Sequence, residues 1–264
     1  MTRGKWQKII DTVVGGLSFI VCLIIFSGCK EDQKALSKPK SSATSVQSEQ
    51  AKQKERQEFE RCLKAAESGD AAEQNNLGFM YANGMGVKED QIKAMKWYLK
   101  ASKQGNPTAQ YNIGTMYLNG EGVKKDHKRA IEWFRKSAEQ GLADAQFNTG
   151  TMYRNGEGIR QDHKQAMEWF QKAAAQGYPE AQYNIGIMYY QGDGVNQDYK
   201  QAVRWFRKAA NQGYADAQNN IGVMYFEGKG VKKNYAQSVE WFRKAARQGH
   251  ELAKETLNDW GESL

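Results

Sequence analysis

The sequence predicts an all-α solenoid, a stack of helix-turn-helix repeats, and two periodic features carry this prediction. Trp recurs every 36 residues, and Gly recurs with the same period at four positions that together hold 21 of the 26 Gly in the chain. Five full repeats therefore cover residues 69–104, 105–140, 141–176, 177–212 and 213–248. The Trp row comprises Trp97, Trp133, Trp169, Trp205 and Trp241.

Each repeat begins with an amphipathic helix, which we name helix A. In the second repeat Pro107 occupies the first helical position, where a backbone N–H is not needed. Ala109, Ile113 and Met116 follow at helical spacing and predict one apolar face. Gly114 lies in mid-helix at a cost of about 1 kcal/mol relative to Ala. Because every repeat has Gly at this position, we expect the backbone of a neighbouring helix to approach closely there.

A Gly-x-Gly loop leads into a second helix, which we name helix B. Gly120 and Gly122 tolerate the left-handed dihedral angles that end helix A. Asp126 is the expected N-cap of helix B, which buries Trp133 and Phe134. Neither helix can bury its apolar face alone, so successive repeats must stack. We expect the Trp row and a Met row in the core; the Met row is Met80, Met116, Met152, Met188 and Met224.

Partial repeats are expected at both ends of the solenoid, which we place over residues 58–264. The pattern from Phe59 to Leu63 resembles a helix B without its helix A. Residues 249–264 have the pattern of a helix A without its helix B, and we expect Trp260 to fold back onto the stack.

Composition and charge exclude several classes of protein. Three Pro and three Cys exclude Pro-rich chains and disulfide-built scaffolds. The net charge of +8 suggests nucleic-acid binding, but five of these charges belong to residues 1–57. The rest of the chain is weakly basic with interleaved signs, so nucleic acid is not an expected partner.

The first 28 residues have the order of a lipoprotein signal peptide. Basic residues precede an apolar run from Val13 to Phe26, and small residues lead to Cys29. The end of this segment resembles a bacterial lipobox, although Phe26 replaces the usual Leu. The resemblance implies cleavage before Cys29 and lipidation of its thiol and amino group. The alternative is an uncleaved signal anchor, for which the apolar run is short.

Residues 29–57 are predicted to be the lipidated Cys29 and a flexible tether. The segment is rich in Ser, Gln and Lys and lacks aromatic residues, so it cannot bury enough apolar surface to fold. Lipoprotein sorting signals place Asp after the Cys for retention in the inner membrane. Lys30 stands there, so the expected location is the bacterial cell envelope, at the outer membrane. Either leaflet of that membrane fits the sequence.

The repeat pattern resembles a known family. Gln110, Ile113, Gly114 and Tyr117 match the tetratricopeptide pattern, except that Gln replaces its first Trp. The 36-residue period, the Ala-Gln-x-Asn-x-Gly-x-Met-Tyr run and the Trp-Phe-x-Lys-Ala-Ala helix look like Sel-1-like repeats over residues 58–258. Glu73 is the main departure, since the other repeats have Ala. The resemblance implies a right-handed α-solenoid that binds proteins, with no fixed ligand.

No catalytic constellation, metal site or cofactor site is predicted, so the chain is not expected to be an enzyme. His127 and His163 lie one repeat apart, too far to share a metal ion, and are interpreted as surface residues. His250 has no carboxylate or Cys pattern around it. Cys62 holds an apolar helix position and is interpreted as a buried thiol. Some cysteine-rich relatives are associated with β-lactams, but they carry a Cys pair in each repeat, and these repeats carry none.

An aromatic stripe on helix A predicts a binding groove for a protein or peptide. In tetratricopeptide solenoids the equivalent positions line the concave face, and aromatic residues are common interface anchors. The alternative is that the stripe packs between repeats. Stacked Asn side chains likewise either bind an extended peptide or join repeat to repeat, and the second interpretation is favoured. The predicted groove residues are Tyr111, Phe147, Tyr183, Tyr190, Phe226, Asn112, Asn148 and Asn184.

The predicted function is a membrane-anchored envelope lipoprotein, a monomer, whose solenoid is a protein-protein interaction module. One alternative is an immunity or inhibitor protein against a secreted toxin or a cell-wall enzyme. Another is a β-lactam-binding or β-lactam-hydrolysing repeat protein, which requires a cluster of carboxylate or His side chains on the concave face.

Overall fold

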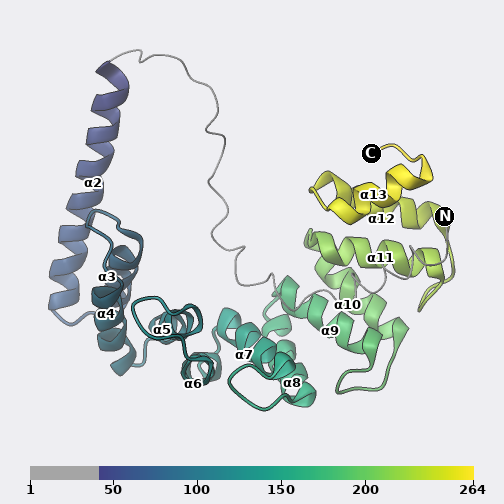
Figure 1. Cartoon of the computed structure of the whole chain (residues 1–264), viewed down its shortest axis with the longest axis horizontal. Coiled ribbons are helices and arrows are strands. Elements are labelled where there is room, and N and C mark those ends of the chain that lie inside the picture. The colour runs from purple at the N-terminus through teal and green to yellow at the C-terminus, as the bar shows by residue number, and fades with distance from the viewer. Residues whose placement is uncertain (1–41) are drawn as a thin grey trace. The chain divides into compact units, whose positions relative to one another are not determined.

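The computed structural model describes residues 42–264, and every regular element in this range is an α-helix (Figure 1). The predicted signal peptide and Cys29 lie outside the described residues. Helix A of the five repeats is α3, α5, α7, α9 and α11, and helix B is α4, α6, α8, α10 and α12. The helices are α2 (Ser42–Glu67), α3 (Ala71–Asn83), α4 (Gln91–Lys103), α5 (Pro107–Asn119), α6 (His127–Glu139), α7 (Ala143–Asn155), α8 (His163–Ala175), α9 (Pro179–Gln191), α10 (Tyr199–Asn211), α11 (Ala215–Glu227), α12 (Tyr235–Arg247) and α13 (Glu251–Trp260).

The described chain divides into two compact bodies. The N-terminal body contains residues 42–152 and 156–160, and the C-terminal body contains residues 153–155 and 161–264. Within the N-terminal body α3 packs on α4, α4 on α5, and α5 on α6. Within the C-terminal body the same order runs from α8 to α13. Within each body these helices thus pack against their neighbours in the chain, and the predicted class, an all-α stack of helix pairs, is confirmed.

The predicted helix boundaries are confirmed by the capping residues. Asp126 accepts a hydrogen bond from the backbone N–H of Arg129, three residues into α6. Asp90, Asp162, Asp198 and Asn234 cap the equivalent helices in the same way. The first Gly of each Gly-x-Gly loop ends helix A in the left-handed region, with φ between 67° and 84°.

The Met row is buried, whereas most of the Trp row is not. Trp169 is buried, but the other four Trp side chains are half-buried. In every repeat the Lys three residues after the Trp lies over its ring, with Nζ 3.6 Å from the ring centre in Lys100 and 4.2 Å in Lys136. The prediction that the whole row is core is therefore wrong. One ring face packs inward, and the other attracts a solvated ammonium group.

The Gly in the middle of helix A makes room for a ring rather than for a backbone. A β-carbon at these positions would lie 2.5–2.9 Å from the aromatic ring of helix B in the same repeat. Close approach is thus confirmed, but the predicted backbone contact is wrong. The described pairs are Gly78 with Tyr98, Gly114 with Phe134, Gly186 with Phe206, and Gly222 with Phe242.

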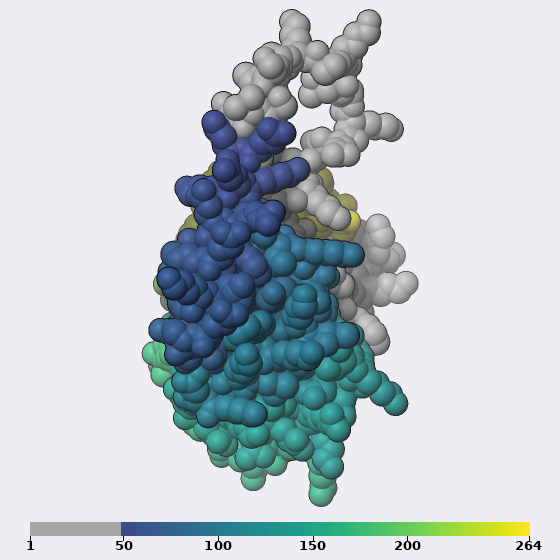
Figure 2. Space-filling view, turned by 90° about the vertical axis from the view of Figure 1, so that its left-hand side faces the viewer, coloured from purple at the N-terminus to yellow at the C-terminus, as the bar shows by residue number. Residues whose placement is uncertain are grey.

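The prediction of a flexible tether is wrong for residues 42–57, which belong to helix α2. A β-carbon at Gly86 would lie 2.3 Å from the carbonyl oxygen of Glu55, and Gly122 meets Gln91 at the equivalent position of the next repeat. Residues 55–67 are therefore a helix B in full register. Lys54 stands where the other repeats have a capping Asp or Asn, so nothing stops the helix and it continues upstream. Figure 2 shows α2 against the first repeats.

The C-terminal end closes as predicted. Helix α13 takes the place of a helix A, and Trp260 at its end packs on three aromatic rings. The ring centres lie 4.9 Å from Phe226, 4.9 Å from Tyr235 and 5.5 Å from Phe242. None of the helices in residues 42–264 is long and apolar enough to cross a bilayer.

Candidate functional site

The predicted groove residues fall in both bodies, and several of them are packed inside the stack. Phe147 is buried in the N-terminal body and Tyr183 in the C-terminal body. The ring centre of Tyr183 lies 5.6 Å from Phe206 and 5.1 Å from Tyr214. Burial raises the pKa of Tyr183 well above its usual range. Phe147 and Tyr183 therefore have little surface to offer a ligand, as the packing alternative predicts.

Tyr111 occupies the same repeat position in the N-terminal body and is half-buried. Its ring centre lies 5.5 Å from Phe134 in helix B of the same repeat. Its hydroxyl accepts a hydrogen bond from Asn148, which belongs to the next repeat. Both contacts fix Tyr111 within the stack, and its side chain stays half-buried.

The Asn side chains join one repeat to the next. Asn112 donates to Asn75 at 3.0 Å, and Asn148 donates to the Tyr111 hydroxyl at 3.4 Å. Asn220 donates to the hydroxyl of Tyr183 at 3.4 Å. Each bond spans 37 residues, one repeat and one position. These bonds favour the structural interpretation of the ladder.

Asn184 departs from this pattern. Its side chain donates to the carbonyl oxygen of Glu180 at 2.7 Å and accepts from Arg154. Arg154 is half-buried on helix A, where the other repeats have Ala82, Leu118, Tyr190 and Phe226. Arg154 is not among the predicted groove residues, although a charged residue at a position that is uncharged in the other repeats is visible in the sequence.

Buried Gln side chains form a second ladder that ties helix A to helix B. Gln110 accepts a hydrogen bond at 2.7 Å from Gln140, the C-cap of helix B in its repeat. Gln146 donates at 3.2 Å to the carbonyl oxygen of Ala138 in the preceding helix B. Equivalent bonds recur at Gln74, Gln182 and Gln218. Because these amides satisfy each other and buried backbone groups, they hold the stack together.

Tyr190 and Phe226 keep part of their surface and lie beside lysines. Lys229 Nζ is 2.8 Å from the Tyr190 hydroxyl and 3.0 Å from a carboxylate oxygen of Glu227. Burial acts to lower the pKa of Lys229, but the bonds to Tyr190 and Glu227 outweigh it and the net pKa is raised. Lys233 Nζ lies 5.2 Å from the ring centre of Phe226. This end of the predicted groove is aromatic and basic.

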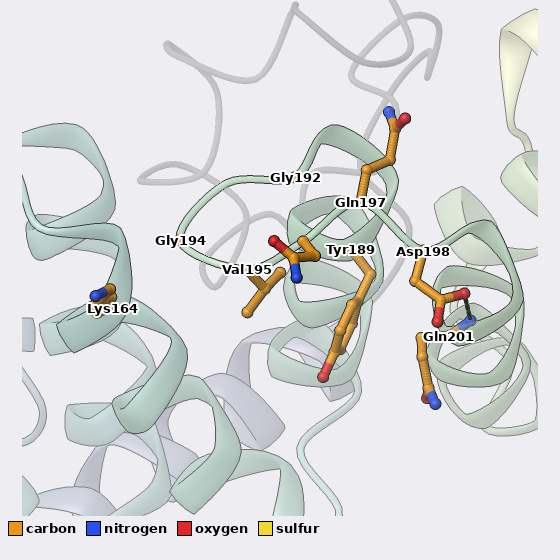
Figure 3. Close-up of a pocket in the computed structure, with 9 residues that line it drawn as sticks. Lys164, Tyr189, Gly192, Gly194, Val195, Gln197, Asp198 and Gln201 are labelled. Carbon is orange, nitrogen blue, oxygen red and sulfur yellow. Dashed lines mark hydrogen bonds between the residues drawn. The ribbon is translucent and has the colours of Figure 1, made fainter.

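A hollow of about 670 Å³ lies beside the Gly192–Asp198 loop in the C-terminal body (Figure 3). Its one carboxylate, Asp198, accepts hydrogen bonds from the backbone N–H groups of Lys200 and Gln201. Asp198 is thus committed to capping α10. The remaining lining is glycine backbone of the loop with Val195, Lys164, Tyr189 and amide side chains (Figure 3). This hollow presents hydrogen-bonding groups but no paired acid and base.

The His and Cys side chains are held by local structure. His127 Nδ1 lies 3.5 Å from Glu157, and His163 is half-buried with Nδ1 lacking a hydrogen-bond partner among the described residues. His250 caps α13 and lies 3.2 Å from Asp216. Cys62 is buried, and burial raises its pKa to about 12. In residues 42–264 no three His, Cys, Asp or Glu side chains gather where a metal ion could bind.

The structure also reveals a separation of charge that the sequence analysis missed. The five B helices α4, α6, α8, α10 and α12 carry 17 basic and four acidic residues. The five A helices carry one basic and five acidic residues. The basic side chains of the B helices are exposed, apart from Arg243, which is half-buried. Counting charge by helix, instead of over the whole chain, would have shown this basic surface.

Comparison with known proteins agrees with this architecture. The family model described as "Sel1 repeat" matches residues 74–106, 107–142, 143–178, 179–214 and 215–250. The chain belongs to the Sel1 repeat family. No curated protein matches it significantly.

Two solved structures of Sel1 repeat proteins illustrate the similarity. The first is c5321, a protective antigen present in uropathogenic Escherichia coli strains that displays an SLR fold. It is 42% identical with a TM-score of 0.75, and the match covers 76% of this chain and 43% of that protein. The second, a Sel1 repeat protein from Oxalobacter formigenes, is 32% identical with a TM-score of 0.73, and the match covers 81% of this chain and 85% of that protein.

Proposed function

We propose that this Sel1 repeat protein is a lipid-anchored protein of the bacterial envelope whose repeats bind another protein. The observation that carries the binding role is the division between constant buried positions and variable, half-buried ones. The buried Gln is identical in all five repeats. On the accessible part of helix A, one position changes from repeat to repeat in size, charge and aromaticity. Its residues are Ala82, Leu118, Arg154, Tyr190 and Phe226.

This division separates the residues that let the repeats stack from the residues that recognise a partner. Constant buried residues keep every repeat stackable, because each must fit the same neighbours. The variable residues differ in size and charge, so stacking requires no single side chain at this position, and their accessible parts are available to recognise a partner. A groove that ends in Tyr190 and Phe226 offers aromatic anchors, a residue type common at the centres of protein interfaces.

The lipid anchor rests on Cys29 and the segment before it. The similarity to a protective antigen supports a place in the envelope, since such an antigen must be accessible to the immune system. We expect labelled palmitate to be incorporated into the full chain and to be lost in Cys29→Ser. Cys62→Ser is the matched control, because its buried thiol should not affect labelling. If Cys29→Ser remains in the membrane fraction to the same extent, an uncleaved signal anchor replaces the lipoprotein proposal.

The binding role is tested by affinity capture from an envelope extract with the full chain as bait. We expect one protein to be enriched and to be lost when Tyr190 and Phe226 are both replaced by Ala at unchanged helicity. Tyr183 is unsuitable for this test because it is buried. A captured toxin or cell-wall enzyme would assign the inhibitor role instead. Equal recovery with the unmodified bait and with a mock bait would contradict the binding role.

A further inference from the structure

The first repeat exposes more large apolar side chains than any other repeat. Among the described residues six large hydrophobic side chains are exposed, and four of them belong to residues 69–104. Two of the four, Ile92 and Leu99, lie on α4 and are 61% and 36% exposed. The other two, Phe79 and Met85, lie on α3 and in the loop that follows it. The repeats have the same fold, so each serves as a control for the others.

The equivalent positions show that packing does not require these apolar residues. At the position of Ile92 the next three repeats have Lys128, Lys164 and Lys200. At the position of Leu99 the later repeats have Arg135, Gln171, Arg207 and Arg243. Charged and polar side chains therefore satisfy the fold at both sites. Exposed aliphatic groups in place of solvated charges need another reason, and burial against a partner supplies one.

The two aliphatic residues share a face of α4 with unpaired lysines. Ile92 and Leu99 are seven residues apart, two helical turns, and Lys96 and Lys103 each lie four residues further along the same face. Lys96 and Lys103 have no carboxylate within ion-pair distance among the described residues. The remaining lysines of α4 are occupied, since Lys93 lies 3.5 Å from Asp90 and Lys100 lies over the Trp97 ring. Helix α4 carries no acidic residue at all.

The aliphatic pair and the two unpaired lysines on one face of α4 indicate which kind of partner fits this surface. A second copy of the chain is disfavoured, because a symmetric contact would bring the same lysines together. A membrane surface is disfavoured too, since an interfacial helix needs a broad apolar face, and the other large aliphatic and aromatic side chains of α4 are buried or half-buried in the stack. An acidic protein segment with an apolar side chain matches both the free ammonium groups and the aliphatic pair.

We propose that the exposed face of α4, formed by Ile92, Lys96, Leu99 and Lys103, is a docking surface for an acidic segment of another protein. An apolar side chain of that segment contacts Ile92 and Leu99, while its carboxylates pair with Lys96 and Lys103. This inference rests on the proposed binding role and places the contact on a B helix, outside the predicted helix A groove.

The test is photocrosslinking from the full chain in its native cells, with benzoylphenylalanine at Leu99. We expect a protein adduct whose crosslinked peptide is rich in Asp and Glu. The same probe at Arg135, the equivalent position of the next repeat, should give a yield lower by roughly tenfold, the factor that 1.4 kcal/mol of binding energy represents.

Two sets of variants check the contributions of the face. Ile92→Lys is compatible with the fold, because three other repeats have Lys there, and it should reduce the Leu99 adduct, whereas Ile92→Val should keep it. Lys96→Glu with Lys103→Glu should abolish the adduct, and Lys136→Glu in the next repeat should not.

Several outcomes would overturn the inference: an equal yield at Arg135, no adduct, or an adduct with lipid, nucleic acid or a second copy of the chain. A parallel probe at Tyr190 separates this inference from the proposed function. A protein adduct at Tyr190 without one at Leu99 keeps the binding role and rejects the α4 surface. If neither position gives a protein adduct, both proposals fail.

Discussion

Gly114 in the middle of α5 lies directly against the ring of Phe134 in α6. A β-carbon on Gly114 would be 2.7 Å from Cδ1 of that ring, well inside van der Waals contact. Phe134 is fully buried, so its ring has no free space to move into. The Gly thus sets the distance between helix A and helix B within the repeat.

Gly114→Ala is expected to destabilise the protein although Ala is the better helix former. The helix preference favours Ala by about 1 kcal/mol. Overpacking against a fixed ring costs about 1–3 kcal/mol. Urea unfolding followed by circular dichroism should therefore show a lower midpoint. The double variant Gly114→Ala with Phe134→Leu should recover part of the loss relative to Phe134→Leu alone, and strict additivity of the two changes would contradict the proposed contact.

Replacing the second Gly of the Gly-x-Gly loop is expected to lower the unfolding free energy more than replacing a Gly that only ends a helix. Gly158 and Gly141 both have positive φ, 71° and 96°, so Ala at either site costs about 1–2 kcal/mol in backbone strain. A β-carbon at Gly158 would also lie 2.3 Å from the backbone of His127, whereas Gly141 has open space. Gly158→Ala should therefore lower the unfolding free energy by at least about 1 kcal/mol more than Gly141→Ala. Equal losses in paired denaturation curves would show that the loop is not in contact with the preceding helix B.

The sequence predicted the repeat and its helices because those features depend on local signals. Asp126 as N-cap and the left-handed Gly120 follow from the chemistry of one residue and its neighbours. The burial of Phe147 did not follow in this way. Its surroundings depend on how far each repeat rotates against the next, and a periodic pattern does not encode that rotation.

Two other differences between prediction and structure arose because net charge and apolar content were taken over long segments of the chain. The net charge of residues 58–264 concealed the basic B helices, since acidic residues of the A helices and loops offset them. The tether prediction considered apolar content alone, whereas the backbone of Glu55 lies against the Gly86 loop of the first repeat. In both cases a residue's role was set by its position in the 36-residue register, which composition ignores.

Tyr98 is expected to make stability fall at alkaline pH. It is buried at the position where the other repeats have Phe134, Phe170, Phe206 and Phe242, and burial raises its pKa well above the usual value of about 10. The neutral hydroxyl is favoured by the fold, so its contribution is complete below pH of about 10 and is lost as the pH rises above that value. Each pH unit in this range removes up to about 1.4 kcal/mol.

Tyr98→Phe is expected to make this pH dependence shallower, and chemical denaturation between pH of about 9 and about 11.5 would measure it. Because four other repeats carry Phe, the variant should fold normally. Phe134→Tyr is the reciprocal change and should steepen the dependence. If the unfolding free energy has the same pH dependence in the unmodified chain and in both variants, the Tyr98 hydroxyl is not buried in solution.

The register of α2 predicts where the chain tolerates truncation. Residues 49–54 are exposed, whereas from Glu55 onward the helix meets the Gly86 loop, and the Phe59 ring packs edge-on against Tyr81 at 5.4 Å. A chain beginning at residue 55 should therefore keep the melting temperature of the longer chain, since no packed side chain is lost. A chain beginning at residue 68 loses Phe59, Cys62 and Leu63 and exposes the apolar face of α3, so its melting temperature should fall by several degrees, as about 1–2 kcal/mol does in a domain of this size. Thermal unfolding followed by circular dichroism compares the two. If the chain beginning at residue 55 is also destabilised, the upstream part of α2 contributes to the stack and the register assigned to Glu55 is wrong.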